Sequence, residues 1–120
     1  MIFSSKVLVD SDTLSFYFKK YPNVVAEAQD YLRQHRIFTF SIISRFEILR
    51  VMKVRNATGQ LKFFDLFCRQ NEIIQLNEKI IIRAADIYAD LYKSGQLVGD
   101  ADILIAATAF ENNFPVVTNN

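Results

Sequence analysis

The chain has 120 residues, which suits one domain with a single hydrophobic core. Half of the residues are hydrophobic (51%), which excludes a disordered chain, and the apolar runs end well before the roughly 20 residues that a membrane span needs. The formal net charge of +1 does not indicate strong nonspecific binding to nucleic acid, although it leaves local basic patches possible.

The N-terminus and the cysteine content indicate a reducing compartment. The first ten residues, MIFSSKVLVD, contain neither the charged region nor the cleavage site of a signal peptide, so we expect none. The single cysteine, Cys68, cannot form an internal disulfide or a structural zinc site. We therefore expect a cytoplasmic protein with no membrane partner, in which Cys68 is a core or half-buried residue.

Strands and helices are expected to alternate along the chain. The expected strands cover residues 2–10, 37–42, 72–76 and 114–119. The expected helices cover residues 13–21, 22–35, 44–56, 60–70 and 77–95, and a last helix runs through the apolar stretch to residue 113. Asn77 is the expected N-cap of the long fifth helix, and Gly95 is its expected C-cap.

This alternation predicts an α/β fold with a mainly parallel sheet flanked by helices. Right-handed crossovers place the carboxyl ends of parallel strands at one edge of the sheet, where sites in such folds gather. Asp10 ends the first expected strand, so we expect it at that edge.

Two acidic residues follow the first two expected strands, and each also has a purely structural interpretation. Asp10 is either a site residue or a helix cap, since VDSDTLS offers several capping side chains. Asp12 is expected as that cap or as a supporting group. Glu47 completes the pattern Ser44-x-x-Glu47, which is that of a capping box. Either interpretation places Glu47 in the first turn after the second strand, at the edge where Asp10 lies.

Helix geometry separates the two aspartates of the segment VGDADILIAATAF. Residues in a helix are about 100° apart, so Asp100 and Asp102 lie on nearly opposite faces. The positions three, four and seven residues after Asp102 are occupied by Ile105, Ala106 and Ala109. This stripe predicts that Asp102 heads the packed face of the helix. Asp100 is then the N-cap or a residue at the rim of the site.

If Asp10, Glu47 and Asp102 converge, their charges need a partner. Two carboxylates about 4 Å apart repel by about 4 kcal/mol at an effective dielectric of about 20, so either one is protonated or a divalent cation neutralises them. Carboxylate oxygens without His or Cys favour Mg²⁺ or Mn²⁺ over zinc. Such a site is suited to metal-assisted hydrolysis of phosphodiesters.

Four segments, VLVDSDTLS, SIISRFEIL, VGDADILIAATA and VVTNN, resemble the motifs of PIN-domain ribonucleases, most closely the VapC-like toxins of type II toxin–antitoxin systems. They occur in the family's order, at family-like spacing, and cover nearly the whole chain. The resemblance implies a PIN-like three-layer fold and Mg²⁺- or Mn²⁺-dependent cleavage of RNA. It also implies inhibition by a cognate antitoxin and the formation of a homodimer.

Carried over residue by residue, the resemblance makes Asp10, Glu47 and Asp102 the catalytic, metal-binding acids. Supporting polar positions are matched by Asp12, Asp100, Thr118 and Asn120. Residues 1–120 then form a single PIN-like domain that lacks the family's last C-terminal segment, which usually contains a further acid and an edge strand. Without that acid, weak metal binding or an impaired toxin is an open alternative.

Two other functions compete with this interpretation. Haloacid dehalogenase-like phosphatases share an Asp-x-Asp pattern after a strand, but Leu14 stands where their pattern has Thr or Val. A catalytically impaired module of the same fold would instead bind an antitoxin or dimerise without cleaving RNA. Loss of metal-dependent RNA cleavage on Asp10→Asn or Asp102→Asn would exclude that module.

Basic residues gather on the third expected helix, which contains Arg45, Arg50, Lys53 and Arg55. A solvated surface is the default interpretation of this helix, and a rim that guides RNA is the functional hypothesis. His35, near a helix end, is expected to favour the helix dipole rather than to act in catalysis.

Overall fold

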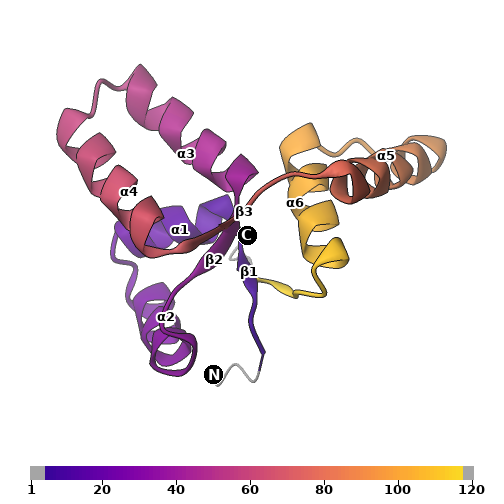
Figure 1. Ribbon diagram of the computed structural model, residues 1–120. Coiled ribbons are helices and arrows are strands. Elements are labelled where there is room, and N and C mark those ends of the chain that lie inside the picture. Colours follow the sequence, from indigo (N-terminus) through magenta and orange to yellow (C-terminus); the bar gives the residue numbers. More distant parts are fainter. Residues whose placement is uncertain (1–4, 118–120) are drawn as a thin grey trace.

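The computed structural model describes residues 5–117, and in this range four short strands alternate with six helices (Figure 1). In chain order the elements are β1 (Leu8–Val9), α1 (Ser11–Phe18), α2 (Pro22–His35), β2 (Thr39–Ser41), α3 (Ile42–Val54), α4 (Thr58–Gln70), β3 (Glu72–Ile74), α5 (Glu78–Lys93), α6 (Asp100–Glu111) and β4 (Val116–Val117). The predicted α/β alternation is confirmed.

The strands pair in parallel. β1 pairs with β4, so that Leu8 lies opposite Val116, and β2 pairs with β3, so that Phe40 lies opposite Ile73. β1 and β2 also contact each other, which brings the two pairs together. Leu8 and Phe40 are fully buried, as expected for parallel strands that are covered on both faces.

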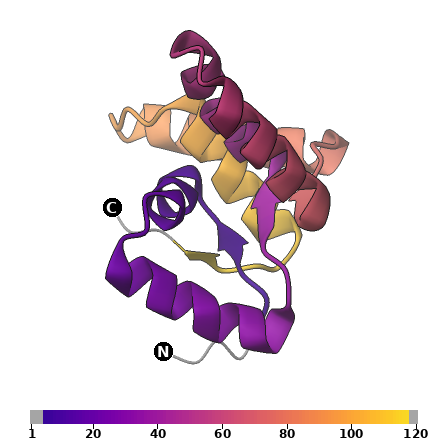
Figure 2. The same cartoon turned by 90° about the vertical axis from the view of Figure 1, so that its left-hand side faces the viewer.

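Helices cover the strands from two sides. Figure 2 shows the strands between α2 on one side and α6 on the other. The largest buried cluster joins β1 and β2 to α1–α4, and it includes Leu14, Tyr31 and Phe64. Cys68 is buried in the same cluster, as predicted, and burial raises the pKa of its thiol.

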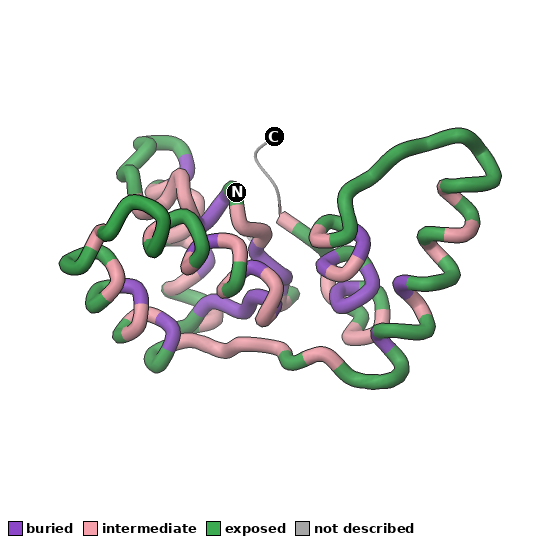
Figure 3. Tube along the Cα trace, turned by 90° about the horizontal axis from the view of Figure 1, so that it is seen from above, coloured by how far each residue is buried: buried purple, intermediate pink, exposed green. Residues whose placement is uncertain are grey.

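Helix α6 lies between the strands and α5. Ile105 and Ala109 pack with Leu8 of β1, whereas Ile103 and Ala107 pack with Ile80 and Ala84 of α5. Figure 3 shows long exposed stretches along α5 and the segment after it, and buried segments where α6 meets the rest of the chain. Within residues 5–117, no helix is long and apolar enough to cross a membrane.

The ends of α5 test the predicted caps. The Asn77 side chain accepts a hydrogen bond from the Ile80 backbone N–H at 2.9 Å, which confirms the N-cap. The C-cap is Ser94 rather than Gly95. Gly95 follows it with φ of 73°, the left-handed conformation that favours glycine just after a helix, so the predicted cap is off by one residue.

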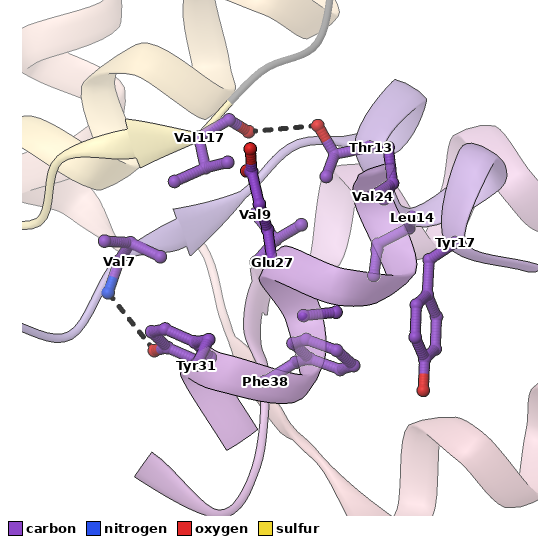
Figure 4. A pocket seen from close by; sticks show the side chains of 11 residues that line it. Val7, Val9, Thr13, Leu14, Tyr17, Val24, Glu27, Tyr31, Phe38 and Val117 are labelled. Atoms are coloured by element: carbon purple, nitrogen blue, oxygen red, sulfur yellow. Dashed lines mark hydrogen bonds between the residues drawn. The ribbon is translucent and has the colours of Figure 1, made fainter. Parts of the chain in front are cut away.

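A small apolar pocket lies between β1, α1 and α2 (Figure 4). Its volume of about 30 Å³ is close to that of one water molecule, and Val9, Leu14 and Phe38 are among its lining residues. Tyr31 and Thr13 also line it, and each makes a hydrogen bond beside it, with the Val7 backbone N–H and the Val117 carbonyl respectively. The pocket is therefore a small gap in the packing between these elements.

Candidate active site

Asp10 directly follows β1 and caps α1. Its backbone is extended, and its Oδ1 accepts a hydrogen bond from the Thr13 backbone N–H at 2.9 Å. Its own backbone N–H donates to the Val117 carbonyl of β4 at 3.1 Å. The cap is thus Asp10 and not Asp12, which is exposed in the first turn of α1. The capping and site interpretations of Asp10 use the same location, because a cap at the end of this strand lies at the expected sheet edge.

Helix α3, which contains Glu47, begins earlier in the chain than predicted. The N-cap of α3 is Ser41, whose Oγ accepts a hydrogen bond from the Ile43 backbone N–H at 3.0 Å. Ser44 is therefore inside the helix and fully buried, and the predicted capping box is wrong. The reason is that α3 begins at Ile42, directly after β2 ends, so Glu47 lies in the second turn of the helix.

Ser11 joins Glu47 to the segment that contains Asp10. The Ser11 hydroxyl donates to Glu47 Oε1 at 2.6 Å, and Arg50 Nη2 lies 3.7 Å from Glu47 Oε2. Ser11 directly follows Asp10, so this bond ties the start of α1 to α3. The sequence analysis missed Ser11, because VDSDTLS contains several hydroxyl groups and only the tertiary contact distinguishes one of them.

Asp100 and Asp102 are both exposed. The predicted cap at Asp100 and the predicted packed position of Asp102 are wrong, whereas the alternative place of Asp100 at the rim of the site stays a prediction. Asp100 is the first residue of α6, whose N-cap is Gly99 with no side-chain capping bond. Asp102 does not head the packed face. Since α6 packs against both β1 and α5, it buries two sides, and Asp102 and Ala106 fall on the side that remains exposed.

The three predicted metal ligands are not gathered around one point. Helix α6 packs against α3 (Figure 1), but no group of three or more His, Cys, Asp or Glu side chains within residues 5–117 is placed to hold a metal ion. In the same range, no hydrogen bond or ion pair engages the side chain of Asp102. The oxygen donors suit Mg²⁺ or Mn²⁺ chemically, while the metal site remains a prediction. Thr118 and Asn120 lie outside the described residues.

A groove of about 460 Å³ extends from Glu47 between α1, α3 and α4. Its lining includes Ser11, Asp12, Ser15, Phe18, Lys19, Glu47, Arg50, Arg55 and Phe63. The basic face of α3 is therefore divided. Arg50 and Arg55 line the groove, whereas Arg45 lies 3.7 Å from Asp65 of α4.

Comparisons with known proteins agree with the fold. The family model described as "PIN domain" matches residues 7–120. The chain is similar to "Ribonuclease VapC1" of Methanocaldococcus jannaschii, with 37% identity over 119 residues that cover 97% of this chain and 76% of the relative.

Two solved structures resemble the whole fold. DNA-bound VapBC from Salmonella typhimurium matches with 26% identity and a TM-score of 0.82, over 100% of this chain and 88% of the other. VapBC2 from Rickettsia felis, bound to a DNA fragment from its promoter, matches with 23% identity and the same TM-score of 0.82, over 97% and 88% of the two chains. At 23% identity the second match supports the fold alone.

Proposed function

Since the chain belongs to the PIN-domain family, we propose that it is a metal-dependent endoribonuclease of the VapC-like toxin type, neutralised by a cognate antitoxin. The observation that carries this proposal is the link between Asp10 and Glu47. These acids follow two different strands, and Ser11, which directly follows Asp10, hydrogen-bonds Glu47. A similar protein at 37% identity is named a ribonuclease, which supports RNA as the substrate.

Mg²⁺ or Mn²⁺ is the proposed cofactor, with Asp10, Glu47 and Asp102 as its ligands. When bound, such an ion supplies a hydroxide nucleophile and offsets charge on the phosphodiester. Asp10 is held directly after β1, Glu47 is held in α3 by the Ser11 hydroxyl, and Asp102 is exposed on a helix that packs against α3. Asp12, Asp100, Thr118 and Asn120 are the proposed supporting residues.

A cognate antitoxin and a second copy of the chain are the proposed protein partners. The similar structures from S. typhimurium and R. felis are described as VapBC, which supports an antitoxin. Along α5 and the segment after it, large apolar side chains are exposed, among them Ile82, Tyr92 and Leu97, whose exposed fraction is 96%. Exposed apolar surface of this kind is typical of a protein interface.

Cleavage of RNA by the purified chain tests the proposal. We expect cleavage with Mg²⁺ or Mn²⁺, and we expect EDTA to abolish it. Asp10→Asn and Asp102→Asn should each lower the rate by about a hundredfold or more, the scale of losing an electrostatic partner of the transition state. Asp86→Asn is the control, because it makes the same change at an exposed carboxylate of α5 that lies outside the groove.

Titration of Mn²⁺ by calorimetry supplies a readout that is independent of turnover. Each Asn variant should bind the ion more weakly than the native chain, because it loses a charged ligand. Antitoxin binding without cleavage of any RNA would contradict the proposal and support the impaired binding module instead.

A further inference from the structure

The groove between α1, α3 and α4 combines cations, an exposed ring and a direct connection to Glu47. We propose that it binds a single-stranded segment of RNA, with backbone phosphates at Lys19 and Arg55 and unpaired bases against Phe63. This inference rests on the proposed ribonuclease function, and it names the path along which the substrate reaches the acids.

The direction of the helices orders the charges along the groove. Both α1 and α3 begin at the strand ends, where Ser11 bonds to Glu47. Lys19 is the C-cap of α1 and Arg55 is the C-cap of α3, so both cations lie at the far end of the groove. The rise of a helix over eight residues places Lys19 about 12 Å from Ser11 along α1. The groove thus runs from an acidic end to a basic end.

The two distal cations are available to a ligand. Lys19 and Arg55 are exposed, and no ion pair engages either of them within residues 5–117. Arg50 also lines the groove, but it lies 3.7 Å from Glu47 and so belongs to the acidic end. Because the whole chain carries a net charge of only +1, this basic end is a local feature, as a guided polyanion requires.

The aromatic side chains indicate a single strand. Phe63 on α4 is 54% exposed, and its ring meets that of Phe18 edge-on, with centroids 5.6 Å apart. Nucleic-acid bases stack on exposed rings of this kind, and a basic groove with an aromatic platform is typical of single-strand binding. Bases in a duplex are already stacked and paired, so they cannot present their faces to Phe63.

Binding of RNA without cleavage tests the groove directly. In an Asp102→Asn background, the affinity for a fluorescein-labelled oligouridine is measured by fluorescence anisotropy at several salt concentrations. Replacing Lys19 and Arg55 by Ala should weaken binding and reduce the slope of log affinity against log salt by about 1.4, or about 0.7 for each lost phosphate contact. Lys53→Ala is the matched control, because Lys53 is exposed on the same helix but does not line the groove.

Phe63→Ala should weaken binding at least about fivefold and leave the salt slope unchanged, because a stacking contact carries no charge. The control is Phe110→Ala on α6, which removes a ring of similar exposure (59%) outside the groove. A duplex of the same length should bind more weakly than the single strand.

The possible outcomes separate this inference from the proposed function. Unchanged affinity and salt slope in the Lys19 and Arg55 variant, while the native chain cleaves RNA, would overturn the groove and keep the ribonuclease. Displacement of the oligouridine by polyglutamate of equal charge would overturn it in favour of an acidic peptide. If the native chain neither binds nor cleaves RNA, the proposed function itself fails.

Discussion

The three proposed metal ligands fall into two groups that the fold treats differently. Asp10 is half-buried and holds the first turn of α1, and Glu47 is half-buried and bonded to Ser11. Asp102 is exposed on α6, and within residues 5–117 nothing bonds to its carboxylate. Hydrogen bonds within the protein therefore fix the carboxylates of Asp10 and Glu47, whereas the carboxylate of Asp102 is exposed on a neighbouring helix without such a bond in the described part of the chain.

The connections between elements explain this difference. Asp10 directly follows β1 and caps α1, and Ser41 is both the last residue of β2 and the cap of α3. With no loop between strand and helix, the position of the strands determines the position of these acids. Helix α6 follows an exposed segment, and its rotation depends on how it packs between β1 and α5. An acid next to a strand end is thus more tightly determined than an acid on a packed helix.

The hydrogen bond from the Ser11 hydroxyl is the most direct target for disturbing the position of Glu47. Ser11→Ala removes the 2.6 Å bond to Glu47 and should lower the cleavage rate about 10- to 100-fold, the usual effect of losing a group that orients a ligand. Ser11→Thr should restore most of the rate because it keeps the hydroxyl. Steady-state kinetics and Mn²⁺ titration measure both variants. If Ser11→Ala cleaves RNA and binds Mn²⁺ as the native chain does, Ser11 does not position Glu47.

Stability separates the two groups more finely. Asp10→Ala removes the cap of α1 and should lower the free energy of unfolding by about 1 kcal/mol. Within the described residues, Asp102→Ala removes no hydrogen bond or ion pair of an exposed side chain, and it should change the free energy of unfolding by less than about 0.5 kcal/mol. Urea unfolding followed by circular dichroism measures both. Asp10→Asn should recover stability without recovering cleavage, because Asn caps as well as Asp. Equal losses of unfolding free energy in the two Ala variants would contradict the distinction between Asp10, which is fixed by hydrogen bonds, and Asp102, which is not.

Local patterns in the sequence were sufficient for the order of the elements and for part of the site. The alternation of apolar strands with longer periodic segments predicted the fold, and the Asn77 cap was read correctly from its neighbours. Asp10 could be placed at the sheet edge because its position depends only on where β1 ends. Glu47 was placed at the same edge although its helix starts earlier than expected. That placement survived because both helix starts follow the same strand.

The features that the sequence could not provide all depend on contacts between distant segments. The prediction that Asp102 heads the packed face assumed that α6 has one such face, but α5 covers a second one through Ile80 and Ala84. No pattern within α6 reveals that second neighbour. The bond between Ser11 and Glu47 joins residues 36 positions apart, and it is equally invisible to local patterns. Sequence periodicity shows which residues of a helix can be buried, and tertiary packing decides which of them are.

Glu72 is a second carboxylate that hydrogen bonds and an ion pair fix in place, and it tests whether such fixation alone indicates a function. In β3 it pairs with Lys6 and accepts a hydrogen bond from Thr39 Oγ1 at 2.8 Å, and the bond from Lys6 contributes most to lowering its pKa. Because the folded-state pKa is lower than the unfolded one, the stabilisation is present above the ordinary carboxyl range. It is lost as the pH falls through the lowered folded-state value. Glu72 is therefore held like Glu47, but it lies outside the groove.

Glu72→Gln should lower the free energy of unfolding at pH 7 by about 0.2–1 kcal/mol, since the pair is more than one-third exposed. It should also flatten the decline in stability as the pH falls through the lowered pKa of Glu72, where the native carboxylate takes up its proton. Urea unfolding at several pH values measures both effects, with Asp86→Asn on the exposed side of α5 as the control. RNA cleavage at pH 7 should be unchanged. A large loss of cleavage would mean that Glu72 also supports the site, although it lies outside the groove. The hydrogen bond to Ser11 would then no longer distinguish Glu47 as a site residue from Glu72.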